Sequence, residues 1–224
     1  MMDLTPITLT LKLAFITTLV LLLISIPLAR WLAFTRSKLK PLIETLVSLP
    51  LVLPPTVLGF YLLLAFSPES NIGQLLESWF GLRLAFSFPG LVIASVIYSL
   101  PFMVHPIQSG LSSLPGALRD ASAIMGKGYL ASLFMGELPN IKPSLLTGLV
   151  LTFAHTMGEF GVVLMIGGSI PNRTRVASIA IYDEVEALNY GTAHQYSLIL
   201  LTIAFLVLLT VYGVNGGYLK KFWK

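Results

Sequence analysis

The chain has 224 residues, of which 55% are hydrophobic and only 11% are charged, and its mean hydropathy is +0.85. Soluble domains carry about 25% charged residues, so a soluble protein of this size could not cover its surface with so few charges. The composition therefore excludes a soluble enzyme, a disordered chain and a collagen-like fibre, and it predicts a membrane protein with several spans. Without cysteine, disulfides, cysteine-based metal sites and thiol nucleophiles are excluded as well.

Long uncharged stretches locate the expected spans, because a helix needs about 20 mostly apolar residues to cross about 30 Å of hydrocarbon. In chain order the segments cover residues 7–34, 42–66, 89–111, 145–168 and 196–215. The first is too long for a cleaved signal and has no basic start, so we interpret it as a retained helix. We predict an all-α, polytopic membrane helical bundle with about five transmembrane helices (six stays open), in which residues 7–215 form a single transmembrane domain.

The distribution of positive charge predicts the orientation, because basic loops stay in the cytoplasm. Ten of the fourteen basic residues fall on one side: Arg30, Arg36, Lys38, Lys40, Arg119, Lys127, Lys142, Lys220, Lys221 and Lys224. The other side receives Lys12, Arg83, Arg173 and Arg175. We therefore expect the N-terminus outside and the C-terminus in the cytoplasm. The net charge of +4 then reflects orientation, and no nucleic-acid partner is expected.

Three loops carry patterns of their own. The external residues 67–88 include IGQLLESWFGL, which has the pattern of a short amphipathic helix. The external residues 173–189 are also helical in pattern and long enough to pack over a cavity mouth. Residues 112–144 form the longest cytoplasmic loop, and there we predict two short helices with a bend at Gly126 and Gly128.

This cytoplasmic loop carries the strongest pattern in the chain. Its pattern consists of an acidic residue followed by two small ones, a glycine six positions after the acidic residue, and a later Leu-Pro pair: Asp120, Ala121, Ser122, Gly126, Leu138 and Pro139. The residues alone leave two interpretations open, an ordinary amphipathic connector or a compact knob for a partner. The spacing resembles the EAA loop of ABC-importer permeases, which has Glu-Ala-Ala, a glycine six positions after the Glu, and Ile-x-Leu-Pro; Gly136 stands where that family has isoleucine. The resemblance implies a coupling helix that docks into a groove of an ATP-binding subunit.

Further stretches resemble the permeases of molybdate transporters. They are residues 48–59 (SLPLVLPPTVLG), 85–88 (AFSF) and 158–161 (GEFG). The resemblance implies the ABC importer permease (MetI-like) fold and a subunit that moves molybdate from an extracytoplasmic binding protein to the cytoplasm by alternating access. A tungstate or sulfate permease stays open as the alternative, because those families are close relatives.

The same resemblance implies the partners and the location. We expect a homodimer in the lipid bilayer of a bacterial or archaeal-type plasma (inner) membrane, with two ATP-binding cassette subunits and an extracytoplasmic molybdate-binding protein. The external loops, residues 67–88 and 169–195, would dock the binding protein. ATP and Mg²⁺ would sit on the partner subunit, with no cofactor bound by this chain.

A proline cluster interrupts the second segment. Pro50, Pro54 and Pro55 each lack an N–H and disrupt a bond one turn back. Backbone groups freed at membrane depth must be satisfied by protein or by a water-filled cavity, so this segment is expected to face the bundle interior. It is either a bend that lines a translocation pathway, together with Thr56, or a kink that only shapes packing.

Glu159 is the one acidic residue deep within a predicted span. A carboxylate there is costly, so it should face the interior and have a partner. His155 lies four residues earlier, on the same face of a continuous helix, and Thr152 and Thr156 add hydroxyls nearby. Glu159 is either part of an outward gate or a structural carboxylate; we favour the second, because a fixed negative charge would repel an oxyanion.

The sequence lacks the motifs of the common catalytic sites. It has no G-x-x-x-x-G-K-[ST] phosphate loop, no H-E-x-x-H and no serine nucleophile elbow. Three histidines, His105, His155 and His194, lie on different segments without ligand spacing, and Pro101 and Pro106 around His105 again suggest either a pathway bend or a packing kink. We therefore predict no catalytic residue and no metal site in this chain. A secondary carrier or channel would need intramembrane charge pairs or inverted repeats, and an intramembrane enzyme would need a catalytic pair.

Overall fold

The computed structural model describes residues 3–118, 126 and 128–215, and every regular element within them is a helix. The elements are α1 (Thr5–Phe34), α2 (Lys40–Val52), α3 (Pro55–Phe66), α4 (Asn71–Phe80), α5 (Phe88–Ser112), α7 (Tyr129–Ala131), the π-helix η1 (Ser132–Glu137), α8 (Leu138–Asn140), α9 (Lys142–Gly158), α10 (Gly161–Gly167), α11 (Ala177–Glu186) and α12 (Tyr190–Asn215). The predicted all-α fold is confirmed.

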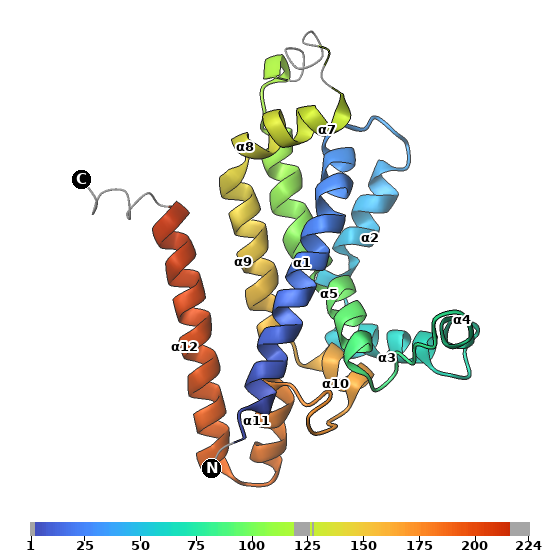
Figure 1. The fold of residues 1–224 in the computed structure, drawn as a ribbon, viewed down its shortest axis with the longest axis vertical. Coiled ribbons are helices and arrows are strands. Elements are labelled where there is room, and N and C mark those ends of the chain that lie inside the picture. Colours follow the sequence, from blue (N-terminus) through green and yellow to red (C-terminus); the bar gives the residue numbers. More distant parts are fainter. Residues whose placement is uncertain (1–2, 119–125, 127, 216–224) are drawn as a thin grey trace.

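Five segments account for the predicted spans. The helices α1, α5 and α12 are each long and apolar enough to cross a membrane alone. The pairs α2–α3 and α9–α10 qualify only together, because their axes bend by 113° and 60° at short breaks. α1 begins and α12 ends toward opposite ends of the bundle, as five spans require (Figure 1). α12 begins six residues earlier than predicted, directly after a turn at Leu188, whose φ is +58°.

The centre of the bundle is formed by α1, α5 and α9, while α12 stands at the side (Figure 1). Inside a bilayer, helices gain little from leaving lipid, so close packing at small residues must hold them together. Gly110 of α5 illustrates this, because a Cβ there would lie 2.5 Å from Ser144 Oγ on α9. Three clusters of buried side chains lie in the described residues: one around Leu32 and Ile107, one around Leu13 and Val162, and one around Ile7 and Tyr196.

Both broken spans are interrupted where the backbone leaves the helical conformation. After α2, Leu53 and Pro54 are extended, and Pro55 then opens α3 in the first turn, where its missing N–H costs nothing. After α9, Glu159 is extended and Phe160 leaves the helical region before Gly161 opens α10. α3 and α10 pack against each other, so the two breaks lie side by side.

Three of the predicted loop helices lie within the described residues and are present there. α4 covers most of the amphipathic segment; Ser70 caps its first turn by accepting from the Gly73 N–H at 2.9 Å, and Gly81 ends it with φ +63°. α11 lies within the second external loop. In the loop of residues 112–144, Gly126 has φ +65°, and a continuous helical stretch, α7–η1–α8, follows Gly128. The first of the two helices expected there lies mostly outside the described residues.

Candidate functional site

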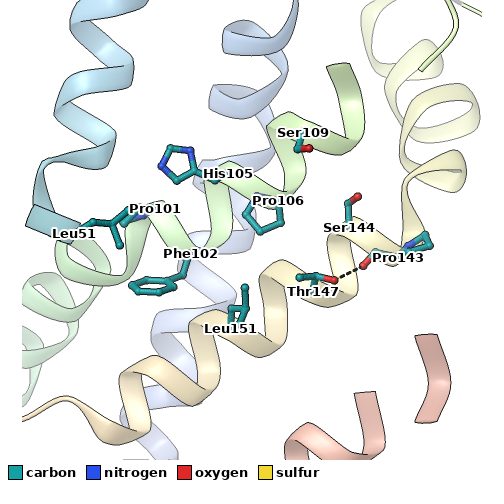
Figure 2. A pocket seen from close by; sticks show the side chains of 10 residues that line it. All are labelled: Leu51, Pro101, Phe102, His105, Pro106, Ser109, Pro143, Ser144, Thr147 and Leu151. Carbon is teal, nitrogen blue, oxygen red and sulfur yellow. Dashed lines mark hydrogen bonds between the residues drawn. The ribbon is translucent and has the colours of Figure 1, made fainter. Parts of the chain in front are cut away.

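A hollow of about 520 Å³ opens between α2, α5 and α9 (Figure 2). It is lined by Leu51, Pro101, Phe102, His105, Pro106, Ser109, Pro143, Ser144, Thr147 and Leu151. Pro101 and Pro106 lie inside α5 without ending it, and both side chains line the hollow (Figure 2). The lining is mostly apolar, carries no charged side chain and offers hydroxyls and one imidazole as polar groups.

The polar groups of this first hollow are held by short contacts. His105 Nε2 lies 3.2 Å from Ser48 Oγ, which ties α5 to α2. Thr147 Oγ1 donates to the Pro143 carbonyl oxygen at 2.9 Å, within α9 (Figure 2). These contacts fix the side chains but do not bring several hydrogen-bond donors to one point, so the hollow has no feature of a tight anion site.

A second hollow, also about 520 Å³, lies at the two breaks. It is lined by Pro55, Thr56, Tyr98, Ala154, His155, Gly158, Glu159, Phe160 and Gly161. The two broken spans touch at its edge, because a Cβ on Gly161 would lie only 2.8 Å from Pro55 Cβ. A glycine is therefore required for the breaks to approach this closely.

Glu159 lies in the second break and is 4% exposed. The expectation that it faces the interior is confirmed. Its expected partner is not found, because neither carboxylate oxygen has a hydrogen-bond partner among the described residues. Its main chain is held instead: the Glu159 carbonyl oxygen accepts from Ser178 Oγ of α11 at 2.6 Å.

His155 belongs to an aromatic stack on α5. Its ring stacks on Phe102 with centroids 4.0 Å apart and lies 4.8 Å from the Tyr98 ring. Its Nδ1 lies 3.0 Å from Ser99 Oγ. α9 ends at Gly158, one residue before Glu159, and His155 and Glu159 both line the second hollow.

The seven predicted pathway residues fall into two groups. The second hollow is lined by Pro55, Thr56 and Glu159, and Pro54 lies in the break beside them. The remaining three are buried within the helices: Pro50, Thr152 and Thr156. Thr156 Oγ1 lies 3.0 Å from Ser99 Oγ, so its hydroxyl serves the contact between α9 and α5.

Sequence reasoning did not identify most of the first hollow. Ser109, Ser144 and Thr147 are ordinary hydroxyl residues on apolar helices, and nothing local marks them as lining residues. The sequence signal for the hollow was the Pro101–Pro106 pair around His105, since two prolines inside one span indicate a helix that faces protein or a cavity; that pair left a pathway bend and a packing kink both open.

The predicted coupling residues are only partly described. Asp120, Ala121 and Ser122 lie outside the described residues. Leu138 packs against the buried cluster around Leu32 and Ile107, and Pro139 lies in the first turn of α8. The described end of this loop is thus fixed against the bundle, and Gly126 precedes it in the left-handed conformation.

Comparison with known proteins adds three findings. Residues 22–222 match the family described as "Binding-protein-dependent transport system inner membrane component". The chain is 48% identical over 212 residues to the molybdenum transport system permease protein ModB of Azotobacter vinelandii, covering 94% of this chain and 93% of that protein. It is 32% identical over 204 residues to a putative molybdenum transport system permease protein of Bacillus subtilis, covering 91% and 90%.

A solved structure matches the fold as well. The chain is similar to a bacterial ABC transporter involved in the import of alginate, with a TM-score of 0.77 and 18% identity over 95% of this chain and 78% of that one. At this identity the likeness concerns the helical arrangement alone.

Proposed function

Because the chain belongs to the family of inner membrane components of binding-protein-dependent transport systems, we propose that it is the permease subunit of an ATP-driven molybdate importer. It is a multi-pass protein of the inner membrane and works with a binding protein, as the family's description says. The observation that supports molybdate as the substrate is the 48% identity to a molybdenum permease over almost the full length of both chains.

The proposed pathway lies between two copies of the chain. The first hollow, on α2, α5 and α9, would face the partner copy, so that two hollows join into one route. Its lining without fixed charge supports passage without tight binding, because affinity can reside in the binding protein. Residues 67–88 and 169–195 would receive that protein on the external side.

The second hollow is the proposed outer constriction. Two broken spans meet there, and the irregular backbone that membranes tolerate only inside protein or beside a cavity is concentrated at Pro54 and Glu159. We assign Glu159 a structural role, because its buried carboxylate would repel an oxyanion. Alternating access then requires the α3–α10 contact to open when the cytoplasmic ends of the bundle approach each other.

In this proposal, ATP hydrolysis by partner subunits supplies the energy for transport. Two ATP-binding cassette subunits would hold ATP and Mg²⁺ and grip the loop of residues 112–144, with Gly126, Leu138 and Pro139 at the contact. The residues Asp120, Ala121 and Ser122 complete the coupling set. This chain itself would supply no catalytic group and bind no cofactor.

Reconstitution of the complex tests the proposal. The chain, its ATP-binding partner and its binding protein are placed in proteoliposomes, and ATP hydrolysis and uptake are measured with molybdate, tungstate and sulfate. We expect molybdate to stimulate both. Equal or greater stimulation by sulfate would assign a sulfate permease, tungstate preference would assign the tungstate alternative, and uptake without ATP would indicate a carrier or channel.

A further inference from the structure

A buried ion pair joins the first span to the cytoplasmic loop. Arg30, near the end of α1, places Nε 2.6 Å from Glu137 Oε2 and Nη2 2.8 Å from Oε1. Two parallel hydrogen bonds of this kind fix the orientation of both groups as well as their distance. The Glu137 side chain is 1% exposed and that of Arg30 is 17% exposed, whereas both partners of every other ion pair in the described residues are at least 20% exposed.

The helical stretch that carries Glu137 is built around this pair. Ser132 Oγ lies 3.5 Å from Glu137 Oε1, and the Arg30 guanidinium lies 4.0 Å from the centroid of the Tyr129 ring. Ser132 and Glu137 are the two ends of the π-helix η1. Residues five apart are stacked in a π-helix but not in an α-helix, and such turns are common at functional sites. The rare turn thus brings hydroxyl and carboxylate to one face, toward α1.

Stability alone does not explain such a pair. Removing two charges from water is costly, and well-packed apolar residues often do as well or better in its place. What an apolar contact cannot supply is a fixed register, since two apolar surfaces can slide over each other while a bidentate pair cannot. The geometry therefore favours a positional role for Arg30 and Glu137.

From this pair, contacts continue to the second hollow. Near the other end of α1, Thr10 Oγ1 accepts from the Ala177 N–H of α11 at 2.8 Å. The next residue of α11, Ser178, donates to the Glu159 carbonyl oxygen in the second break. α1 is one helical element of 30 residues that also contains Pro27, so Arg30 and Thr10 lie on the same helix. One continuous series of contacts thus links Glu137 to the break of the fourth span.

We propose that the Arg30–Glu137 pair is the positioning device that transmits movement of the cytoplasmic loop to α1, and through α11 to the second break. This inference rests on the proposed function, because it needs an ATP-binding partner that moves residues 112–144. Leu138 and Pro139 follow Glu137 directly, so a displacement at the proposed docking contact acts on the pair at once.

The test measures coupling instead of activity alone. In the reconstituted complex, Arg30→Gln and Glu137→Gln should lower the molybdate transported per ATP hydrolysed by about fivefold, while ATP hydrolysis continues. Lys40→Gln is the matched control, because Lys40 is also a cation at the cytoplasmic ends of the helices and its Nζ lies 3.9 Å from Glu44 in an exposed pair. The control should keep the wild-type ratio.

A double variant separates positioning from folding. Arg30→Leu with Glu137→Leu removes both charges, so no buried charge is left unpaired and the complex should assemble in wild-type amounts. We expect the transport ratio to stay low in this variant. A wild-type ratio in it, or in Glu137→Gln, would overturn the positional role alone. A wild-type complex without molybdate-stimulated ATP hydrolysis would overturn the proposed function, and this inference with it.

Discussion

The second and fourth spans are both broken where they meet, but their breaks are built from different residues. The break between α2 and α3 is set by Pro54 and Pro55, which remove two N–H groups, and it bends the chain by 113°. The break at Glu159 keeps all its N–H groups, bends by 60°, and is held from outside by Ser178. The first bend is fixed by covalent structure, while the second depends on contacts that can be released.

This difference suggests a division of labour in the proposed transport cycle. A bend made by prolines cannot straighten without breaking α3 away from α10, so the α2–α3 break provides the fixed side of the second hollow. The bend between α9 and α10 can change by backbone rotation at Glu159 and Phe160, before Gly161, so it provides the moving side of the second hollow. The following predictions test whether the two breaks differ in this way.

The largest effect is expected where the two breaks touch. Gly161→Val places a Cβ within 2.8 Å of Pro55 Cβ, and the overpacking should destabilise the α3–α10 contact by about 1–3 kcal/mol. We expect uptake to be nearly abolished and the thermal unfolding of the purified complex to begin at lower temperature. Gly191→Ala is the control, because nothing lies within 4 Å of a Cβ there. Normal uptake by Gly161→Val would show that the breaks separate freely.

Restoring the N–H groups of the first break should have the next largest effect. With Pro54→Ala and Pro55→Ala together, α2 can extend toward α3, because a proline inside a helix costs about 3 kcal/mol and alanine removes that cost. We expect uptake to fall by about fivefold, because the bend is then no longer enforced. Since the chain has no cysteine, spin labels at Leu46→Cys and Leu64→Cys report the bend directly. Longer and broader label distances are expected. An unchanged distribution would mean that packing against α10, and not proline, sets the angle.

The sequence predicted the first break better than the second for a local reason. Proline marks a helix break by its own chemistry, so the bend near Pro54 and Pro55 was predictable, although its size of 113° was not, because the residue types alone do not give the angle between two helices. The second break has no comparable marker, since residues 159–161 include no proline, and only the structure shows that α9 ends at Gly158.

Contacts between distant residues explain the rest of what sequence reasoning missed. Arg30 and Glu137 are 107 positions apart, and no periodicity relates them. Each looked like an ordinary charge, one near the end of a span and one in a loop. The five spans, by contrast, follow from the length of uncharged stretches alone, which is why their number and most of their bounds agree with the structure.

Neutralising the carboxylate of the second break should have a small effect. Glu159→Gln keeps the shape of a side chain whose oxygens have no hydrogen-bond partner among the described residues, so the complex should assemble normally. We expect uptake within about twofold of wild type, since the amide fills the same space as the carboxyl group and keeps one oxygen acceptor. Size-exclusion chromatography of the purified complex checks the assembly. Loss of the folded complex would contradict the structural role assigned to Glu159 and would make its charge essential.

The smallest effect is expected at the tether of the second break. Ser178→Ala removes the 2.6 Å bond to the Glu159 carbonyl oxygen, a loss of about 1 kcal/mol, and leaves both helices intact. Amide hydrogens of Phe160 and Gly161 should then exchange about fivefold faster, because the break opens more often, while those of Val57 and Leu58 behind the proline break should be unchanged. Equal acceleration at both sites would show that the two breaks move as one body. Acceleration at the second site alone would identify the Glu159 break as the moving side of the second hollow.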